Sequence, residues 1–380
     1  MRPRTVLLDA TFVRPRQTGI GWAAVELLQA LAARDDPRWR FRVAVTAPDT
    51  LADLWARPGW EPLPVPDPRS TLWRRWRWLA GGLDRLAAAT GADLVHALTM
   101  PGPLRCRVPA LVTVHDLVYR VLPETVPAGR RWWYRATVPP SLARARLLLV
   151  NSRATGEEVA REFPRLAGRI RLTRFGTPGW VLRREPPPPR PRSAPWLFVG
   201  MLEPRKNLDR LLDAYLAFRR GLPAGETPPE LVIVGARGWR NRRLRRRLQE
   251  LAAGGTVRLR GHADREELWE LFTRAGLLLF PSLHEGFGFP ILEAMAANLP
   301  VLTGDRHAMA EVAGDAALTV DPTSVTAIRD GMRRFWSEPD LAPRLARRGR
   351  RRALAWRWSD TAAATMAAYA EALDEPARRP

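Results

Sequence analysis

Residues 277–294 read LLLFPSLHEGFGFPILEA and decide the fold of this chain. The first four are apolar and predict a short buried strand, which Pro281 ends because proline cannot donate to a strand ladder. The last residues predict a helix, and Pro290 suits its first turn, where a missing N–H leaves no hydrogen bond unmade. A buried strand that runs through a glycine-containing loop into a helix is typical of an open α/β sheet, whose ligands bind at the carboxyl ends of the strands.

The same alternation of strand and helix extends over the rest of the chain. The N-terminal half begins with an apolar strand at 5–9, and Thr18-Gly19-Ile20-Gly21 leads into an amphipathic helix through about Leu31. Further strands are predicted at 41–45, 94–97, 110–114, 147–150, 196–199, 231–234 and 257–259. Further helices are predicted at 208–218, 244–251 and, after a capping box, 264–274. The sequence therefore predicts α/β architecture in both halves, with the first half doubly wound.

The length of the chain points to two domains. At 380 residues it exceeds what one ordinary hydrophobic core supports. Residues 185–195, EPPPPRPRSAP, contain successive prolines that forbid a helix or a central strand and favour a stiff extended connector. We therefore place an N-terminal domain at 1–185, a proline-rich linker at 186–195 and a C-terminal domain from 196 onward.

The composition is that of a folded protein with a large excess of positive charge. Hydrophobic residues make up 46% of the chain, which excludes a disordered or fibrous protein. The 61 Lys and Arg against 39 Asp and Glu give a formal net charge of +22. Such a field attracts polyanions, which include nucleic acid, anionic lipid headgroups and phosphorylated substrates.

Cysteine content and hydropathy indicate the cellular compartment of the chain. Cys106 is the only cysteine, which excludes an intramolecular disulfide and a thiolate metal cluster and agrees with a reducing cytoplasm. The apolar residues 6–8 are cut by Asp9, which leaves no signal-peptide core, and no run of 18 apolar residues predicts a transmembrane helix. We expect a cytoplasmic protein whose attachment to a membrane would be peripheral.

Two carboxylates flank the glycines of residues 281–294. Glu285 is predicted in the loop and Glu293 in the first turn of the following helix, while Gly286 and Gly288 let the backbone approach a ligand closely. Carboxylates accept hydrogen bonds from vicinal hydroxyls, so the pair suits a sugar and a ribose. The structural alternative is a helix-dipole glutamate beside a surface glutamate.

A second strand end carries adjacent cations, in GMLEPRKNL at 200–208. Arg205 and Lys206 at a helix N-terminus can neutralise a diphosphate and stabilise it as it leaves. In so arginine-rich a chain they could equally form a solvated surface pair, with Asn207 as an ordinary N-cap.

Together these segments resemble the retaining glycosyltransferases of family 4. The likeness is densest from 196 to 322, where EPRKN, PSLHEGFGFPILEAMA and EVAGDAALTVDP follow in the family's order and spacing. The resemblance implies the α/β fold known as GT-B, in which two Rossmann-like doubly wound domains face a central cleft. It also implies a donor domain at 196–355 and a C-terminal helix at 356–380 that crosses back to the N-terminal domain.

The resemblance assigns roles to individual residues of the C-terminal half. Arg205 and Lys206 match the family's ligands of the donor diphosphate. Glu285 matches the carboxylate that contacts the donor sugar, and Glu293 matches the one that holds the nucleotide ribose. The loop whose backbone amides reach the sugar hydroxyls and the phosphate is matched by Phe287, Gly288 and Phe289.

The resemblance reaches three segments of the N-terminal half. His115, in VHDL at 114–117, matches a histidine near the transferred sugar, although a lone histidine is more often structural. Gly19 and Gly21 match a glycine loop that approaches the donor phosphates, and a GxG pattern by itself is weak evidence. Asn151 also matches a family position, but we expect it to cap the next helix.

In the C-terminal half, residues 303–311 depart from the family pattern, so no nucleotide contact is assigned there.

The resemblance implies transfer of a sugar from a nucleotide-diphosphate donor to a glycan or lipid-linked acceptor in the synthesis of cell-surface polysaccharide or glycolipid. The sugar would be mannose or another hexose, and GDP-mannose is the donor expected from its frequency in the family. Retention implies a front-face displacement, since the family pattern offers no carboxylate nucleophile. No cofactor or metal is expected, because the sequence has no DxD-like acidic cluster and no His/Cys ligand set.

Other functions would use some of the same residues. A nucleotide-sugar epimerase of the same overall fold would bind the same donor, and a glycosidase would use two carboxylates without needing Arg205 and Lys206. A nucleic-acid-binding protein would use the +22 charge and the arginines among tryptophans at 72–78 and 130–135. Its basic residues, however, are spread over both domains, and the glutamate pair would have no role. We therefore expect no nucleic acid partner.

The same Trp/Arg segments suggest an anionic membrane surface as a partner. Trp73 and Trp76 lie among Arg74, Arg75 and Arg77, a composition that suits the lipid headgroup region on the inner face of a membrane. The alternative is a solvated helix whose tryptophans pack inward, and the sequence leaves both readings open.

Overall fold

The computed structural model describes residues 2–15, 18–236, 238–239 and 242–374, which form two compact units. The N-terminal unit comprises Met1–Leu117, Ala128–Gly176 and Arg357–Pro380, and the C-terminal unit comprises Val118–Pro127 and Thr177–Trp356. The division therefore falls at Gly176 instead of the predicted 185, and the last helix belongs to the N-terminal unit.

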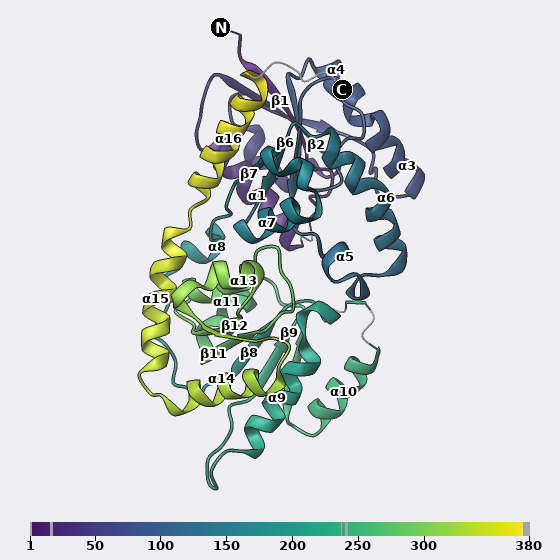
Figure 1. Ribbon diagram of the computed structural model, residues 1–380. Helices are drawn as coiled ribbons and strands as arrows, with labels where there is room; N and C mark the ends of the chain where they lie inside the picture. The colour runs from purple at the N-terminus through teal and green to yellow at the C-terminus, as the bar shows by residue number, and fades with distance from the viewer. Residues whose placement is uncertain (1, 16–17, 237, 240–241, 375–380) are drawn as a thin grey trace. The chain divides into compact units, whose positions relative to one another are not determined.

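Within the described residues, the N-terminal unit contains a parallel sheet of seven strands in the order β3-β2-β1-β4-β5-β6-β7 (Figure 1). The strands are β1 Arg4–Asp9, β2 Trp39–Val45, β3 Trp60–Pro64, β4 Leu94–Ala97, β5 Ala110–Val114, β6 Leu147–Val150 and β7 Ile170–Leu172. From β1 the chain proceeds to one edge through β2 and β3, then returns to β4 beside β1 and proceeds to the other edge. The strand order thus reverses between β1 and β4, as in a doubly wound fold.

Helices connect these strands in the N-terminal unit. They are α1 Gly19–Ala32, η1 Pro48–Leu51, α2 Ala52–Trp55, α3 Leu72–Arg77, η2 Trp78–Gly82, α4 Leu83–Thr90, α6 Ala128–Arg144, α7 Arg153–Glu162, η4 Pro164–Arg169 and α16 Trp358–Asp374. The last of them, α16, packs against α1 although more than 300 residues separate them in sequence. The Tyr369 hydroxyl on α16 lies 2.7 Å from His96 Nδ1 on β4, and both side chains are fully buried. This helix is therefore an integral part of the N-terminal unit.

The described part of the C-terminal unit contains a parallel sheet of six strands in the order β10-β9-β8-β11-β12-β13. The strands are β8 Trp196–Val199, β9 Leu231–Val234, β10 Val257–Gly261, β11 Leu277–Phe280, β12 Val301–Gly304 and β13 Leu318–Val320. The helices are α5 Val118–Val121, η3 Pro123–Thr125, α8 Gly179–Leu182, η5 Pro204–Lys206, α9 Leu208–Arg220, α10 Arg242–Ala253, α11 Arg265–Arg274, α12 Phe289–Ala296, α13 His307–Ala313, η6 Gly314–Ala316, α14 Val325–Ser337 and α15 Leu341–Ala355. β8 and β11 are neighbours, with Trp196 opposite Leu277, so their carboxyl ends meet at one edge.

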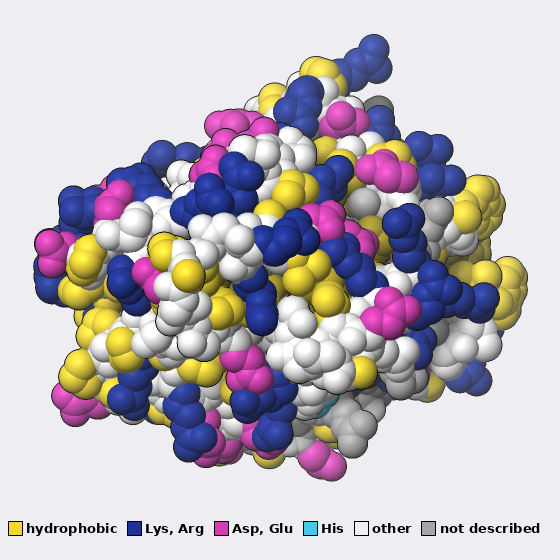
Figure 2. Space-filling view, turned by 90° about the horizontal axis from the view of Figure 1, so that it is seen from below, with side chains coloured by type: hydrophobic (Ala, Val, Ile, Leu, Met, Phe, Trp, Pro, Cys, Tyr) yellow, Lys and Arg dark blue, Asp and Glu magenta, His cyan; other side chains and the backbone are white. Residues whose placement is uncertain are grey.

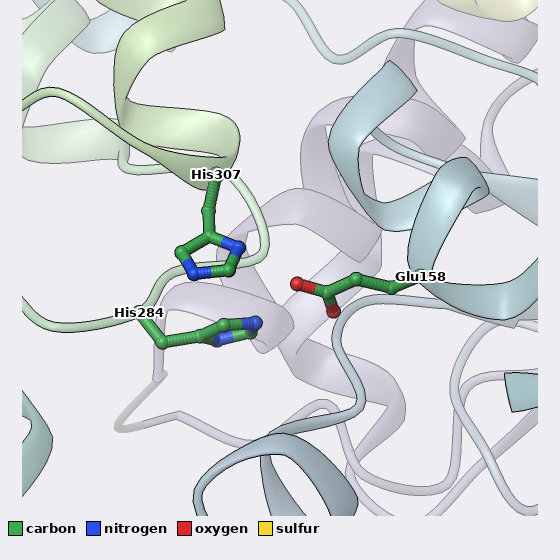
Figure 3. Close-up of side chains that lie close together, drawn as sticks. All are labelled: Glu158, His284 and His307. Carbon is green, nitrogen blue, oxygen red and sulfur yellow. The ribbon is translucent and has the colours of Figure 1, made fainter. Parts of the chain in front are cut away.

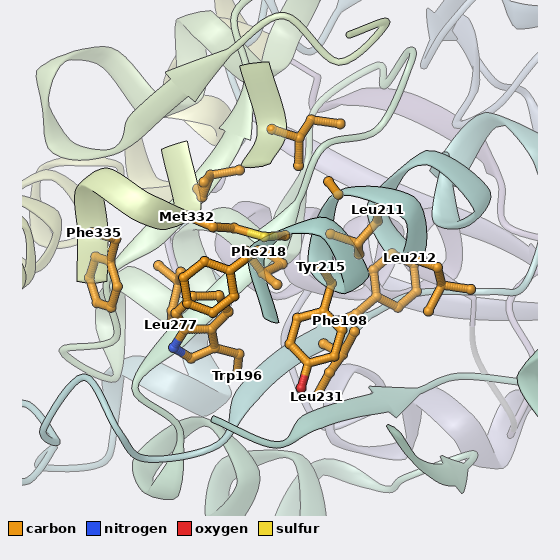
Figure 4. Packing of buried hydrophobic residues seen from close by; sticks show 14 of the residues in the cluster. Trp196, Phe198, Leu211, Leu212, Tyr215, Phe218, Leu231, Leu277, Met332 and Phe335 are labelled. Carbon is orange, nitrogen blue, oxygen red and sulfur yellow. The ribbon is translucent and has the colours of Figure 1, made fainter. Parts of the chain in front are cut away.

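An aromatic core fixes the C-terminal sheet against α9 and α14 (Figure 4). Trp196 at the start of β8 is fully buried, and its ring centroid lies 4.9 Å from that of Phe218 on α9 and 6.1 Å from that of Phe335 on α14. Each of these aromatic side chains removes about 150–250 Å² from water, so the core provides a rigid base for the loops at the strand ends.

The strands that the sequence analysis missed have identifiable reasons. β3 reads WEPLP, and its two prolines and edge position hide the strand pattern. β7 and β13 are edge strands of three residues each, too short for a periodic signal. β12, VLTG, is fully buried, but its four residues lie directly after Pro300 and give no alternation. The apolar runs at β4, β5, β6, β8, β9 and β11 are confirmed with the predicted bounds.

The proline-rich segment is extended, as predicted, but it is fastened to the C-terminal unit. The Asn298 Nδ2 donates to the Pro187 carbonyl at 3.1 Å, and Arg190 Nε donates to the Thr273 carbonyl at 2.9 Å. Farther along, the Arg192 guanidinium lies over the Trp336 ring, 4.9 Å from its centroid. The segment therefore belongs to the C-terminal unit, and the division between the units precedes it instead of falling within it.

None of the helices in the described ranges is both long enough and apolar enough to cross a membrane.

Candidate active site

The predicted cations and one predicted carboxylate come together at the edge where β8 and β11 end. Arg205 and Lys206 lie in η5, which follows β8, and Glu285 lies in the loop that follows β11. Because β8 and β11 are adjacent parallel strands, both loops leave the sheet at the same edge. The backbone N–H of Leu283 donates to the Arg205 carbonyl at 2.8 Å and so joins the two loops directly.

Glu285 binds both cations at once. Lys206 Nζ donates to Glu285 Oε1 at 2.6 Å, and Arg205 Nη1 forms an ion pair with Glu285 Oε2. Arg205 Nη1 also donates to the His284 carbonyl at 3.0 Å. Lys206 and Glu285 are each 7% exposed and Arg205 is partly exposed, so Arg205 and Lys206 are not the solvated surface pair that the sequence left open.

A second carboxylate, Glu203, completes the cluster, and the sequence analysis did not identify it. Its Oε1 lies 2.7 Å from Arg205 Nη2, and its side chain is almost fully buried. The cluster thus holds two cations and two carboxylates, whose formal charges cancel. Glu203, Lys206 and Glu285 are buried and Arg205 is partly exposed, and an opposite charge beside each buried ion offsets part of the cost of its burial. The signal for Glu203 is its place two residues before Arg205 in the EPRKN segment.

Burial and the neighbouring charges shift the pKa values of this cluster. Burial by itself would raise the pKa of the Glu285 carboxyl, but the charges of Arg205 and Lys206 outweigh it and lower that pKa to about 2. For Lys206, burial lowers the pKa of the ammonium, while Glu285 opposes the shift. Glu285 is therefore an ionised carboxylate at neutral pH and accepts from both cations.

Asn207 does not make the ordinary N-cap hydrogen bond that the structural alternative assigned to it. It stands at the N-cap position of α9 with φ of +61°, but its side chain makes no capping hydrogen bond. Its Nδ2 donates instead to the carbonyls of Pro281 at 2.9 Å and Pro322 at 2.6 Å. Asn207 therefore fastens the cation-bearing turn to the loop after β11 and to the segment after β13.

The glycine-containing loop reaches α12 through one backbone position that requires glycine. Gly288 has φ of +102° at the N-cap of α12, in the left-handed region that side chains rarely adopt. Phe287 is buried, and its ring centroid lies 4.9 Å from that of Phe289 and 5.6 Å from that of Trp356. The Phe287 side chain thus packs inside the unit and holds the loop backbone in place.

Glu293 lies farther along its helix than predicted. α12 begins at Phe289, so Glu293 falls in the second turn and not in the first. Its side chain is partly exposed, whereas that of Glu285 is buried. The ribose role of Glu293 stays a prediction.

Two histidines lie side by side in the C-terminal unit next to these loops. The ring centroids of His284, directly before Glu285, and His307, at the start of α13, are 4.7 Å apart (Figure 3). His307 has φ of +54°, an uncommon backbone conformation for a residue other than glycine, as do Asp35, Asn207 and Asn298. Two imidazoles are fewer ligands than protein zinc sites use. Glu158, also labelled in Figure 3, belongs to the N-terminal unit.

His115 lies at the end of β5 in the N-terminal unit and is 6% exposed. Its Nε2 donates to the Leu98 carbonyl at 2.9 Å, so this nitrogen carries the proton in the neutral ring. Burial lowers the pKa of the imidazole, partly opposed by the backbone contact and by Asp116, so the neutral form is favoured. The structure fixes the orientation of His115 and leaves its predicted role near the transferred sugar untested.

The cap of α7 is Ser152 and not Asn151, which corrects the prediction. Ser152 Oγ accepts from the Thr155 N–H at 3.1 Å. Asn151 Nδ2 donates to the His115 carbonyl at 3.1 Å instead. Asn151 therefore positions the chain that carries His115, since both residues are buried at the ends of adjacent strands.

Gly19 and Gly21 lie in the first turn of α1 and not in a loop before it. The Thr18 hydroxyl caps this helix by accepting from the Gly21 N–H at 3.4 Å. A Cβ at Gly19 would meet no atom within 4 Å, so the position is open. The two residues directly before Thr18 lie outside the described residues.

Comparisons with known proteins show the family to which the chain belongs. The family profile of glycosyl transferases group 1 matches residues 184–352, and that of Glycosyltransferase Family 4 matches residues 18–176. The O-antigen chain mannosyltransferase B of Escherichia coli is 30% identical over 272 residues, which cover 68% of this chain and 70% of that protein.

Solved structures share the fold at lower identity. Sucrose-phosphate synthase from Thermosynechococcus elongatus matches with a TM-score of 0.71 and 21% identity, over 97% of this chain and 98% of that one. Anabaena Alr3699/HepE, solved in complex with UDP and glucose, matches with a TM-score of 0.70 and 16% identity, over 97% of this chain and 100% of that one. With both family profiles and the E. coli relative, the chain belongs to glycosyltransferase family 4 and is a glycosyltransferase with the GT-B fold.

Proposed function

We propose that this glycosyltransferase moves mannose or another hexose from a nucleotide-diphosphate donor to a glycan or lipid-linked acceptor, with retention of configuration. The observation that carries the proposal is the buried cluster of Arg205, Lys206 and Glu285 at the carboxyl ends of β8 and β11. Paired cations at that edge of an α/β sheet suit a diphosphate, since donor phosphates bind where helix N-termini and cations converge. No cofactor is assigned.

The cluster supplies charge where the reaction develops it. As the bond from the anomeric carbon to the donor phosphate breaks, negative charge grows on the leaving diphosphate, and Arg205 and Lys206 stabilise it. Glu285 and Glu203 hold the two cations in place before the donor binds, which lowers the reorganisation that the transition state requires. The acceptor hydroxyl then attacks from the face that the diphosphate leaves, and the departing phosphate oxygen accepts the hydroxyl proton.

The choice of donor draws on the relatives. The E. coli relative is named a mannosyltransferase, which supports mannose as the sugar, and GDP-mannose is the first donor to test. The Anabaena structure with UDP and glucose supports a nucleoside diphosphate as the leaving group.

A screen of donors tests the proposed function. GDP-, UDP-, ADP- and dTDP-sugars are added separately to the full chain, and one of them is expected to raise the melting temperature, since a ligand of the native state stabilises it by mass action. With that donor and an acceptor extract, nucleoside diphosphate is expected to appear in step with transferred sugar, and EDTA is expected to leave the rate unchanged.

The same assay separates the alternative enzymes. An epimerase would convert the sugar without releasing nucleoside diphosphate, and a glycosidase would cleave a glycoside without any nucleotide. If no nucleotide sugar stabilises the chain and none is consumed, the proposal is wrong.

The distribution of charge does not favour a nucleic-acid partner. On the face seen in Figure 2, Lys and Arg side chains lie dispersed among Asp, Glu and hydrophobic side chains and form no continuous basic stripe. A nucleic-acid-binding surface needs clustered cations that follow the phosphate backbone. We propose that the +22 charge serves phosphorylated substrates and lipid headgroups.

The Trp/Arg segments support the proposal of membrane association. Trp73 on α3 is 67% exposed, Trp76 is 42% exposed and Trp132 on α6 is 68% exposed, and basic residues surround them in sequence. Arg75 lies over the ring of the buried Trp133, 4.7 Å from its centroid, which joins α3 to α6. We define Trp73, Trp76 and Trp132 as the tryptophan patch, whose large exposed rings beside arginines suit the headgroup region of an anionic membrane.

Vesicle sedimentation tests the tryptophan patch. The full chain is expected to bind vesicles that contain phosphatidylglycerol more tightly than vesicles of pure phosphatidylcholine. This binding is expected to weaken as the salt concentration rises. Replacing Trp73, Trp76 and Trp132 together with Ser is expected to weaken binding by about tenfold or more, because the apolar contact is lost. The control is Leu354→Ser, which removes an exposed apolar side chain elsewhere. Equal binding of both variants would rule out the patch.

A further inference from the structure

The N-terminal unit has a pocket that the donor chemistry does not use. It lies at the carboxyl ends of β1 and β4, and its lining includes Asp9, Thr99 and Pro101. Asp9 is the last residue of β1, and Thr99 lies two residues after β4. Since strand order reverses between β1 and β4, the pocket lies where doubly wound sheets bind ligands.

One wall of the pocket is rigid. Asp9 is buried, and its Oδ1 accepts from the Thr11 N–H at 3.1 Å and from the Thr11 hydroxyl at 2.7 Å. Its Oδ2 accepts from Trp78 Nε1 at 3.0 Å. These bonds fix the Trp78 ring as an apolar wall and leave the Asp9 carboxylate with a set orientation. Because these side chains are already ordered, a ligand that binds here loses little free energy to ordering them.

The other wall carries two arginines, Arg69 and Arg75. Each is held by an aromatic ring: the Arg69 guanidinium lies 5.2 Å from the centroid of Phe12, and that of Arg75 lies 4.7 Å from the centroid of Trp133. In the part of the chain that the structure describes, no carboxylate oxygen lies within 4.0 Å of either guanidinium. Their two positive charges repel each other; Asp9 and Asp67 oppose the charge of Arg69, and Arg75 hydrogen-bonds with Tyr134.

An anionic group of a ligand would reduce the repulsion between Arg69 and Arg75. The guanidinium is a planar fork of donors that matches a phosphate in bidentate fashion, and it is held here without a carboxylate partner. Asp67 is paired with Arg14, so Arg69 and Arg75 against Asp9 leave a net positive charge, which favours an anion over a neutral sugar. Asp9 and Thr99 add groups that bind hydroxyls, as the sugar attached to such a phosphate requires.

We propose that this pocket binds a phosphate group of the acceptor, held by Arg69 and Arg75, with the adjoining sugar hydroxyls toward Asp9 and Thr99. The proposal rests on the proposed glycosyl transfer and names the acceptor class: a phosphate-bearing sugar, either free or linked to a lipid through a diphosphate. The enzyme would then handle one phosphate group in each unit, the donor's at Arg205 and Lys206 and the acceptor's at Arg69 and Arg75.

Calorimetric titration with inorganic pyrophosphate in 150 mM NaCl tests the pocket by stoichiometry. The wild-type chain is expected to bind two pyrophosphates, and the double variant Arg69→Gln/Arg75→Gln is expected to bind one. The charge-retaining variant Arg69→Lys/Arg75→Lys should keep two sites, the one in the pocket at least about tenfold weaker because the bidentate contacts are lost. Circular dichroism checks that each variant is folded.

One matched double variant serves as the control. Arg57→Gln/Arg34→Gln removes two exposed charges of the same unit away from the pocket and should keep both sites. If Arg69→Gln/Arg75→Gln binds as many pyrophosphates as this control, the proposal is overturned. If the donor assignment alone were wrong, wild type would bind one pyrophosphate, and the pocket variant would still lose it.

Competition separates the two sources of the phosphate. In wild type with the donor site filled by excess nucleoside diphosphate, displacement of pyrophosphate by mannose 1-phosphate assigns a soluble sugar phosphate. Displacement by geranyl diphosphate and not by the sugar phosphate assigns a lipid diphosphate. Failure of both to displace pyrophosphate would overturn the pocket as an acceptor site.

Discussion

Lys206→Ala is expected to lower kcat for sugar transfer by about 100- to 1,000-fold, since it removes a cation aimed at charge that develops on the leaving diphosphate. Lys206 is buried and donates to Glu285 at 2.6 Å, so its ammonium is held in one position before the donor arrives. Single-turnover rates at saturating donor measure the effect on the chemical step apart from product release.

Two further variants show whether the loss in Lys206→Ala comes from the charge. Lys206→Arg keeps a cation and should recover part of the rate, whereas Arg258→Ala removes an exposed partner of Glu230 in the same unit and should leave the rate unchanged. Near-normal turnover by a folded Lys206→Ala enzyme with its verified donor would show that Lys206 does not stabilise the leaving group.

Glu285→Gln is expected to destabilise the C-terminal unit by about 3–5 kcal/mol at pH 7, because it leaves Lys206 buried without its carboxylate. The wild-type contribution has a defined pH dependence. The folded-state pKa of Glu285 is about 2 and its ordinary value is 4.5, so the stabilisation is complete above pH 4.5 and is lost as the pH falls toward 2. The variant should therefore be less stable at pH 7 and less sensitive to acid within that window.

Thermal unfolding at a series of pH values measures both effects on stability. The control Glu230→Gln removes the carboxylate of an exposed ion pair with Arg258 and should change stability by less than about 1 kcal/mol. A Glu285→Gln protein that melts like the wild type at pH 7, or that loses stability in acid as steeply, would contradict the buried ion-pair account.

The central strands were predictable because both faces of a parallel sheet are covered, so each strand reads as a continuous apolar run. The runs LVHA at β4 and LLLF at β11 are of this kind. Edge strands need not be apolar throughout, because they are less covered than central strands. The edge strand β3, WEPLP, contains prolines that a central strand would not accept. The division at Gly176 was not predictable, because the proline-rich segment follows it and is held by contacts such as that of Pro187 with Asn298.

The sequence predicted that Arg205, Lys206 and Glu285 lie at one sheet edge, but it did not predict the contacts that depend on how the loops pack. Arg205, Lys206 and Glu285 stand in dense motifs after apolar strands, and the fold brings them together. The pairing of Glu203 and the tethering role of Asn207 depend on which loops meet across the sheet edge, which spacing does not indicate.

The central claim is that Arg205 and Lys206 bind the diphosphate of the donor. Calorimetric titration of wild type and Lys206→Ala with the donor's nucleoside diphosphate, and separately with the nucleoside alone, tests it most directly. The account predicts that Lys206→Ala binds the diphosphate at least about tenfold more weakly, as the loss of one charge-assisted contact implies, and binds the nucleoside as wild type does. Diphosphate affinity equal to that of the wild type, or an equal loss for both ligands, would contradict it.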